Sequence, residues 1–208
     1  MCYNEPVSWA TFFIGTLFTL LNLYKFKNFK EIIVISIYWF SAVTMQIWEA
    51  LIHRYKNNQE LCAIFSKSAR INNFIQPMVL VLLLFDTKKY DMNFFIKALA
   101  VLVILTFYYN EFYPKNMIDK CGWTPKGIKY AWLVKRTPII YVIVNVLLMY
   151  LLLKEKYRRF QIFLFIASLG LSFIIRYGYF SGSIWCWIAA LLPLVNYIYF
   201  TYYNPPNR

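Results

Sequence analysis

Histidine and acidic residues are scarce in this chain, and their scarcity excludes several kinds of active site. The 208 residues contain one histidine, His53, and nine aspartates and glutamates in total. Zinc-dependent membrane hydrolases of the ceramidase and progestin-receptor type need several histidines for their metal, so this class is excluded. The sequence also has no phosphate-binding loop, no nucleophile elbow and no paired carboxylates. It therefore assigns no catalytic residue and no cofactor.

Charged residues are also few, at 15% of the chain, whereas hydrophobic residues make up 61%. Soluble globular proteins have about 25% charged and about 45–50% apolar residues. Aromatic residues reach 21%, and Tyr and Trp favour membrane–water interfaces. An AT-rich genome would raise the lysine content everywhere, but the lysines lie almost entirely between the apolar runs. The composition predicts an integral membrane protein whose main partner is the lipid bilayer.

The net charge of +13 does not indicate a nucleic-acid partner. Basic residues stand in short stretches beside the apolar runs, and no separate basic domain is present to hold a duplex. Nucleic acid is therefore excluded, and anionic lipid headgroups account for the charge. We expect no cleavable signal peptide at the first apolar run, and Cys2 in place of glycine excludes N-myristoylation.

Seven apolar runs approach the length of about 20 residues that crosses a hydrocarbon core. The sequence predicts an all-α fold in which residues 1–208 form a single transmembrane domain of about seven helices. The third run is polar in its first half, so six crossings, with this run only dipping in, is the main alternative. The last run has no lysine for a Schiff base, which excludes a retinal protein. The predicted helices lie near residues 8–24, 32–52, 62–85, 92–109, 138–153, 160–176 and 184–203.

Two prolines and two asparagines within these runs have structural explanations. Pro77 and Pro193 are expected to kink their helices and to free a backbone carbonyl each. Asn145 and Asn196 are expected to tie neighbouring helices together through hydrogen bonds.

Lysine and arginine predict the orientation, because cytoplasmic loops carry an excess of both. The loops after the first, third and fifth runs are basic, while residues 177–183 include no basic residue. The N-terminus is therefore predicted outside and the C-terminus in the cytoplasm. The long loop at residues 110–137 conflicts with this assignment, since it carries six basic residues on the predicted outer side. The basic residues of the other loops are Lys25, Lys27 and Lys30, then Lys88 and Lys89, then Lys154, Lys156, Arg158 and Arg159.

All four cysteines fall on the predicted outer face, together with His53. Three interpretations stay open: free thiols buried among helices, disulfides formed in an oxidising compartment, or metal or cofactor ligands alongside His53 and Glu49. The spacing matches no short metal-binding motif. The four are Cys2 before the first run, Cys62 at the head of the third, Cys121 in the long loop and Cys186 near the start of the last.

Glu49 is the one carboxylate well inside an apolar run, where an uncompensated charge is costly. Gln46, Glu49 and His53 are spaced three and four residues apart, so they share one stripe of a helix. The sixth run carries serines and Arg176 at every fourth position, and we expect Arg176 to pair with Glu49. The predicted ligand or ion pocket lies in the outer half of the bundle and comprises Gln46, Glu49, His53, Asn73, Gln76, Ser172, Arg176 and Trp185.

Four short motifs stand out along the chain: Met1-Cys2-Tyr3-Asn4, residues 46–50, Gln76-Pro77 and residues 183–187. Together they resemble an uncharacterised family of multi-pass membrane proteins that open with Met-Cys-aromatic-Ser and carry Gln-x-x-Glu-Gly, Gln-x-x-Pro and Ser-x-Trp-Cys-aromatic elements. Ala50 replaces the glycine, and the Gln-Pro spacing is shorter. The resemblance implies a seven-helix fold and no activity. It implicates Cys2, Gln46, Glu49, Trp185 and Cys186 together.

Three functions fit these features. In the first, a transporter, channel or ligand-binding protein holds a small ligand, or passes protons or ions, in the polar pocket with Glu49 as the titrating or binding group. In the second, a membrane enzyme or redox protein is centred on Cys2, His53 and Cys186. In the third, a structural or interaction protein uses the pocket only to hold its helices together. The sequence favours the first, and it names neither the ligand nor the oligomeric state.

Overall fold

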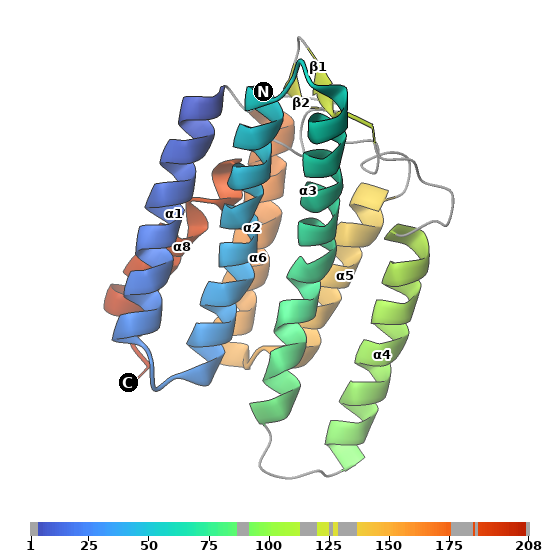
Figure 1. Cartoon of the computed structure of the whole chain (residues 1–208). Helices are drawn as coiled ribbons and strands as arrows, with labels where there is room; N and C mark the ends of the chain where they lie inside the picture. Colours follow the sequence, from blue (N-terminus) through green and yellow to red (C-terminus); the bar gives the residue numbers. More distant parts are fainter. Residues whose placement is uncertain are drawn as a thin grey trace.

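The chain folds as an all-α bundle, as the sequence predicts (Figure 1). The computed structural model describes residues 4–86, 92–112, 120–124, 127–128, 137–175, 185 and 187–206. Long helices run alongside one another, and a small antiparallel hairpin lies at one end. The elements are α1 (Glu5–Lys25), α2 (Lys30–Arg54), α3 (Gln59–Val79), the 3₁₀ helix η1 (Leu80–Asp86), α4 (Met92–Phe112), β1 (Trp123–Thr124), β2 (Gly127–Ile128), α5 (Thr137–Leu152), α6 (Glu155–Ile175), α8 (Leu192–Ile198) and the π-helical turn η2 (Tyr199–Tyr203).

The third and last runs are less regular than predicted. α3 ends at Val79 and the chain continues as the 3₁₀ helix η1. This change follows Pro77, which has no N–H group to donate and crowds the carbonyl four residues earlier. The last run contains a turn at Ala190 and Leu191 before α8 begins. Pro193 lies in the first turn of α8, where a missing N–H group is tolerated.

Asparagine caps fix where α1 and α3 begin. Asn4 Oδ1 accepts the Val7 N–H at 3.0 Å, and Asn58 Oδ1 accepts the Leu61 N–H at 3.1 Å. Each cap satisfies one of the backbone donors that the first turn of a helix leaves without an intrahelical partner. The second cap ends the short turn after α2, so α3 returns antiparallel beside α2 (Figure 1).

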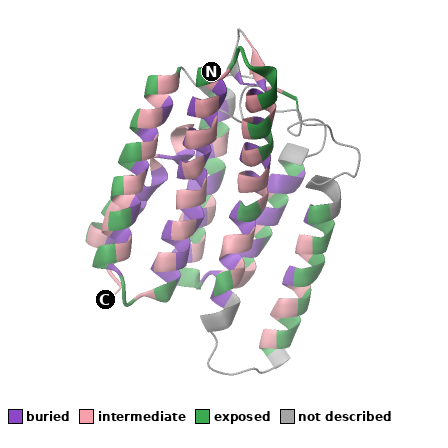
Figure 2. Ribbon diagram, in the orientation of Figure 1, coloured by how far each residue is buried: buried purple, intermediate pink, exposed green. Residues whose placement is uncertain are grey.

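Burial along α1 is inverted relative to a helix of a soluble protein (Figure 2). Its outward residues include Phe13, Leu17 and Leu20, which are 54–64% exposed. Helices in water bury their apolar stripe instead. The inward stripe of α1 is small or polar and recurs every three or four residues: Ser8, Thr11, Gly15, Thr19 and Asn22.

The same inversion occurs along α3. Its outward residues include Ile64 and Ile75, each about half exposed. Its buried stripe is Cys62, Ser66, Ala69, Arg70, Asn73, Gln76 and Pro77. Arg70, Asn73 and Gln76 of the polar third run therefore face the interior of the bundle, whereas Lys67 is exposed.

Two helices, α1 and α2, are long and apolar enough to cross a membrane. Shorter apolar helical stretches are Asn93–Tyr109 within α4 and Ile139–Leu152 within α5. Within the described residues, length and composition thus indicate membrane association.

The two ends of the bundle differ in chemistry. The turns that join α1 to α2 and α5 to α6 lie at the end that holds the C-terminus (Figure 1), and both are basic. We call this end, with Lys25, Lys27, Lys154 and Arg158, the basic end. At the opposite end Cys62 and Cys121 form a disulfide, and we call it the disulfide end.

Candidate functional site

Glu49 lies on α2 near the disulfide end and is fully buried, with 0% of its surface exposed. Gln46 Nε2 donates to Glu49 Oε2 at 3.1 Å, as their three-residue spacing on one helix allows. Gln46 Oε1 in turn accepts the Thr11 hydroxyl of α1 at 3.0 Å. A buried chain of hydrogen bonds, Thr11–Gln46–Glu49, thus joins α1 to α2. His53 follows one turn later on α2 and is half-buried.

The register between α2 and α3 places Arg70 close to the height of Glu49. Thr44 Oγ1 donates to Asn72 Oδ1 at 2.8 Å, so these two residues lie at one level of the bundle. Helices rise by about 1.5 Å per residue. Glu49 lies five residues beyond Thr44 toward the disulfide end, and Arg70 lies two residues beyond Asn72 in the same direction. The two residues are therefore within about one helical turn of each other in height. Arg70 is only 4% exposed.

The register between α2 and α6 adds Ser172 to the same level. Trp39 Nε1 donates to Gln161 Oε1 at 2.8 Å, and both helices run toward the disulfide end (Figure 1). Glu49 lies ten residues beyond Trp39 and Ser172 eleven beyond Gln161, so their heights differ by about 1.5 Å. Ser172 is fully buried, and its hydroxyl donates to the Leu169 carbonyl at 2.6 Å.

Buried polar side chains from four helices therefore lie at about the same height in the bundle. A carboxylate there can exchange a proton, accept further hydrogen bonds or bind a cation, and a buried guanidinium or amide can orient a polar ligand. Ser8 Oγ, one turn above Thr11, has no hydrogen-bond partner among the described residues. We call Ser8, Thr11, Gln46, Glu49, Arg70 and Ser172 the polar layer.

Asn73 and Gln76 were grouped with Glu49 by the sequence pattern, but they lie nearer the basic end. By the same register they are about 9 and 13 Å from the height of Glu49. Gln76 Oε1 accepts the Tyr141 hydroxyl of α5 at 2.6 Å, and the Asn73 carbonyl accepts the Tyr108 hydroxyl of α4 at 3.2 Å. Both side chains are buried; the Gln76 side chain ties α3 to α5, and the Asn73 backbone carbonyl ties α3 to α4.

Trp185 is buried against α5 and α6. Its indole Nε1 donates to Ser168 Oγ at 2.9 Å. Its ring centroid lies 5.5 Å from that of Tyr141 and 5.8 Å from that of Phe165. Trp185 therefore joins the aromatic packing beside the polar groups through one hydrogen bond to α6.

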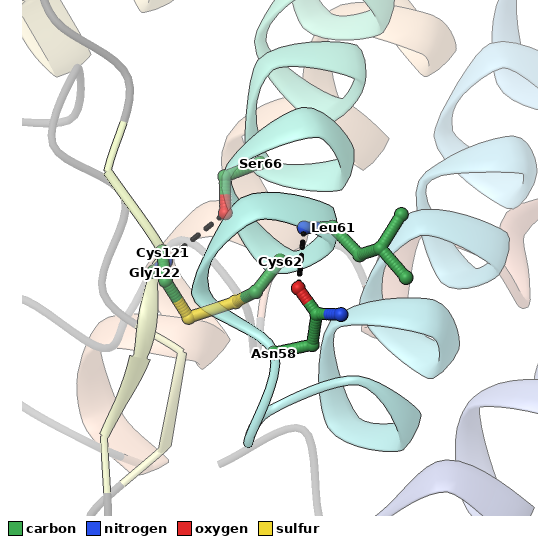
Figure 3. Close-up of a disulfide and its surroundings, with 6 residues drawn as sticks. All are labelled: Asn58, Leu61, Cys62, Ser66, Cys121 and Gly122. Atoms are coloured by element: carbon green, nitrogen blue, oxygen red, sulfur yellow. Dashed lines mark hydrogen bonds between the residues drawn. A yellow bond between two sulfur atoms is a disulfide. The ribbon is translucent and has the colours of Figure 1, made fainter.

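A disulfide covers the head of α3 (Figure 3). Cys62 and Cys121 are bonded, with their Cα atoms 4.8 Å apart across 59 residues of sequence. Gly122 N–H donates to Ser66 Oγ at 3.0 Å, one turn further along α3. Lys56 Nζ lies 5.3 Å from the centroid of the Trp123 ring. The described part of the long loop, residues 120–124 and 127–128, is thereby attached to the disulfide end.

Three predicted site residues, Cys2, Arg176 and Cys186, lie outside the described residues. The expected ion pair between Glu49 and Arg176 therefore stays a prediction. Among the described residues no three histidine, cysteine, aspartate or glutamate side chains group closely enough to hold a metal ion.

Sequence reasoning missed Thr11 and Tyr141 as hydrogen-bond partners of the predicted residues, and Arg70 as a buried residue near the height of Glu49. The signal for Arg70 was present, because a charged residue within an apolar run marks a functional site as strongly as Glu49 does. Thr11 and Tyr141 carried no such signal. Their roles depend on which helices become neighbours.

Other buried polar residues bind the helices to one another. The Tyr38 hydroxyl of α2 donates to Asn145 Oδ1 of α5 at 2.8 Å, and Gln161 Nε2 of α6 donates to Asn196 Oδ1 of α8 at 2.8 Å. The prediction that Asn145 and Asn196 tie helices together is confirmed. Asn22 Nδ2 of α1 donates to the Pro193 carbonyl at 2.9 Å.

An ion pair between the exposed Lys154 and the buried Glu31 lies at the basic end. Lys154 Nζ lies 3.4 Å from Glu31 Oε2, and the Lys154 N–H donates to Glu31 Oε1 at 2.6 Å. Burial raises the pKa of the Tyr157 hydroxyl above its usual value, and the Glu31 carboxylate and Tyr199 raise it further. Tyr157 therefore stays neutral at physiological pH. Separately, the Lys154–Glu31 ion pair holds the start of α6 to α2.

No protein-family model matches the chain, and no curated protein or solved structure shows significant similarity to it. The resemblance to a family of multi-pass membrane proteins thus rests on the sequence motifs alone.

Proposed function

We propose that the chain is a multi-pass membrane protein of about seven crossings that binds a small polar ligand, or passes protons or ions, at the polar layer around Glu49. The observation that carries the proposal is a fully buried carboxylate at the end of a buried hydrogen-bond chain, Thr11–Gln46–Glu49.

The inverted burial of α1 and α3 supports a membrane location beyond the two most apolar helices. A stripe of Ser8, Thr11, Gly15 and Thr19 offers little hydrophobic driving force for packing in water. In a bilayer, small and polar residues let helices approach closely and hydrogen-bond across the interface. The large outward residues of α4, α5 and α6 extend the apolar surface: Phe95, Leu99, Leu102, Ile139, Ile143, Phe163 and Ile174 are each 49–83% exposed.

Two independent features support an outside N-terminus and a cytoplasmic C-terminus. The α1–α2 and α5–α6 turns at one end are basic, as the excess of lysine and arginine in cytoplasmic loops predicts, whereas Arg54, Lys56 and the basic residues of the 110–137 loop count against this orientation. The Cys62–Cys121 disulfide lies at the other end, and disulfides persist in oxidising, non-cytoplasmic compartments. Both features support an outside location for the end that holds the polar layer.

The chemistry of the polar layer supports a functional site. Burying a carboxylate in an apolar interior is costly and is retained where the group pairs, protonates or faces a wet cavity. Unpartnered buried oxygens are costly too, and Ser8 Oγ has no hydrogen-bond partner within the described residues. A bound polar ligand or a file of water would satisfy such atoms.

Replacement of Glu49 by glutamine tests this proposal, because it removes the titrating group and keeps the shape. In liposomes that contain a pH-sensitive dye, the wild-type chain is expected to dissipate an imposed proton gradient or a gradient of a permeant cation. Glu49→Gln is expected to reduce that flux at least about tenfold, the loss that corresponds to about 1.4 kcal/mol.

Glu60→Gln is the matched control, since Glu60 is an exposed carboxylate near the same end. It is expected to leave flux unchanged. A wild-type flux that Glu49→Gln does not alter would contradict the proton or ion reading. For ligand binding, a screen for thermal stabilisation by small polar compounds should yield ligands whose effect Glu49→Gln removes.

A structural role is the second candidate, and the hydrogen bonds between helices favour it. The Trp39–Gln161–Asn196 chain links α2, α6 and α8 without any exposed member. If the polar layer serves only this purpose, Glu49→Gln lowers the melting temperature and changes neither flux nor ligand stabilisation. The two candidates therefore differ in one measurement.

A further inference from the structure

A surface hollow lies at the corner between α5 and α6 at the basic end. Its lining combines two arginines, one carboxylate, one tyrosine and two apolar side chains. None of these residues belongs to the polar layer. The lining residues are Tyr150, Glu155, Arg158, Arg159, Ile162 and Phe163.

The lysines beside this hollow are engaged elsewhere. Lys154 pairs with Glu31 at 3.4 Å, and Lys156 Nζ donates to the Pro205 carbonyl of the C-terminal tail at 3.1 Å. The positive charge that faces the hollow therefore comes from its arginines. Arg159 pairs with Glu155 at 2.7 Å, with both side chains largely exposed, which leaves Arg158 as its main uncompensated cation.

Arg158 is held in position while its terminal nitrogens stay available. Its Nε donates to the Leu153 carbonyl at 3.1 Å. Its guanidinium carbon lies 4.8 Å from the centroid of the Tyr150 ring, a distance at which the ring attracts the cation. A guanidinium fixed in this way presents a fork of donors, which matches the oxygens of a phosphate group.

The wall below the arginines is apolar and faces outward. Phe163 is 65% exposed, and Ile166, one turn further along α6, is 51% exposed. Tyr150, at the end of α5, is 58% exposed, as suits an aromatic residue at a membrane interface. A lipid whose phosphate binds the arginines would thus find apolar side chains for its acyl chain on the side toward the bilayer core.

We propose that this hollow binds an anionic phospholipid, with its headgroup phosphate on Arg158 and Arg159 and an acyl chain along Ile162 and Phe163. The inference rests on the proposed membrane location, because it places the basic end at the cytoplasmic leaflet. Anionic lipids concentrate in that leaflet, and each basic residue near it contributes about 1 kcal/mol of attraction.

Native mass spectrometry of the detergent-purified full chain tests the proposal, with phosphatidylglycerol and phosphatidylcholine as the probes. The wild-type chain is expected to retain one phosphatidylglycerol in preference to phosphatidylcholine. Arg158→Gln is expected to lower the apparent affinity for phosphatidylglycerol about fivefold or more. Arg158→Lys keeps the charge and loses the fork, so it should fall between the two, and it serves as the test if Arg158→Gln does not fold.

Lys27→Gln is the control, because it removes one exposed basic residue from the same end outside the hollow. Equal losses in Lys27→Gln and Arg158→Gln would overturn the proposal in favour of diffuse attraction. Full competition by glycerol phosphate would also overturn it, since a soluble phosphate does not use the apolar wall. Extraction of the chain from membranes by carbonate would refute the membrane location itself, whereas a resistant chain without lipid preference would refute only the lipid site.

Discussion

Gly15 shows at the scale of one residue how closely the helices approach. A Cβ atom at this position would lie 2.5 Å from the Ala190 carbonyl oxygen and 2.6 Å from Val43 Cγ2. Real Cβ atoms essentially never come so close, and a backbone carbonyl cannot move aside as a side-chain tip can. The contact among α1, α2 and the last run therefore depends on the absence of a side chain.

Gly15→Ala is expected to destabilise the fold by about 1–3 kcal/mol, the usual cost of added volume in a packed interior. Gly170→Ala is the matched control, since a Cβ there meets nothing within 4 Å. That change should be neutral or slightly stabilising, because alanine favours helices more than glycine does. Thermal unfolding of both variants in the same detergent measures the difference. Equal melting temperatures for the two would show that α1 does not pack as described.

The β1–β2 hairpin is attached to the bundle mainly through the disulfide. β1 and β2 are only two residues each, and such a hairpin is not stable by itself. Its attachment comes from the Cys62–Cys121 bond and from the Ser66 hydroxyl that accepts the Gly122 N–H. Ile128 of β2 is buried, with 1% exposed. Residues 120–124 and 127–128 are thus attached to the disulfide end.

Cys62→Ala and Cys121→Ala are expected to destabilise the chain by similar amounts. A bridge across 59 residues contributes up to about 4 kcal/mol in the chain-entropy description, and less where the unfolded chain stays in a bilayer. The double variant should lose no more than either single one. Alkylation before and after reduction, followed by mass measurement, should show two additional thiols released from the wild-type chain. Strictly additive losses would mean that the two cysteines act separately.

The whole molecule has one basic and one disulfide-bonded end, and the described ends of the chain lie on opposite sides of it (Figure 1). An odd number of crossings produces that arrangement. Lys27 is exposed in the turn between α1 and α2, and Asn57 is exposed in the turn between α2 and α3, so labels at these positions test which side of the membrane each end faces. Neither takes part in the disulfide.

Lys27→Cys and Asn57→Cys are expected to face opposite sides of the membrane. In a background with Cys2 and Cys186 replaced by alanine, a membrane-impermeant maleimide should label Asn57→Cys in intact cells. It should label Lys27→Cys only after the cells are permeabilised, because the proposed orientation places the α1–α2 turn in the cytoplasm. Labelling of both from the same side would contradict an α2 that crosses the membrane.

Hydrophobic run length predicted most helix positions. The run at 32–52 became α2, Lys30–Arg54, and the run at 138–153 became α5, Thr137–Leu152. Length alone did not predict where an apolar run changes from an α-helix to a 3₁₀ helix or a turn. The change to a 3₁₀ helix after Pro77 and the turn at Ala190 depend on local backbone bonding that hydropathy does not report.

The candidate site was predictable where its residues share one helix. Spacing placed Gln46 beside Glu49, and the hydrogen bond between them follows from it. Spacing says nothing of register between helices, which the Thr44–Asn72 and Trp39–Gln161 pairs set. Spacing therefore could not show that Gln76 hydrogen-bonds to Tyr141 of α5.

The span enclosed by the Cys62–Cys121 bond has a consequence for biosynthesis. The bond encloses α3, η1 and α4 in one covalent ring. Cys121 leaves the ribosome only after those helices have been made, so the ring closes late. In the proposed membrane location, a protease that extracts helices cannot then pull either helix out of the bilayer alone. Degradation of the mature chain should then depend on prior reduction or on a cut within the loop.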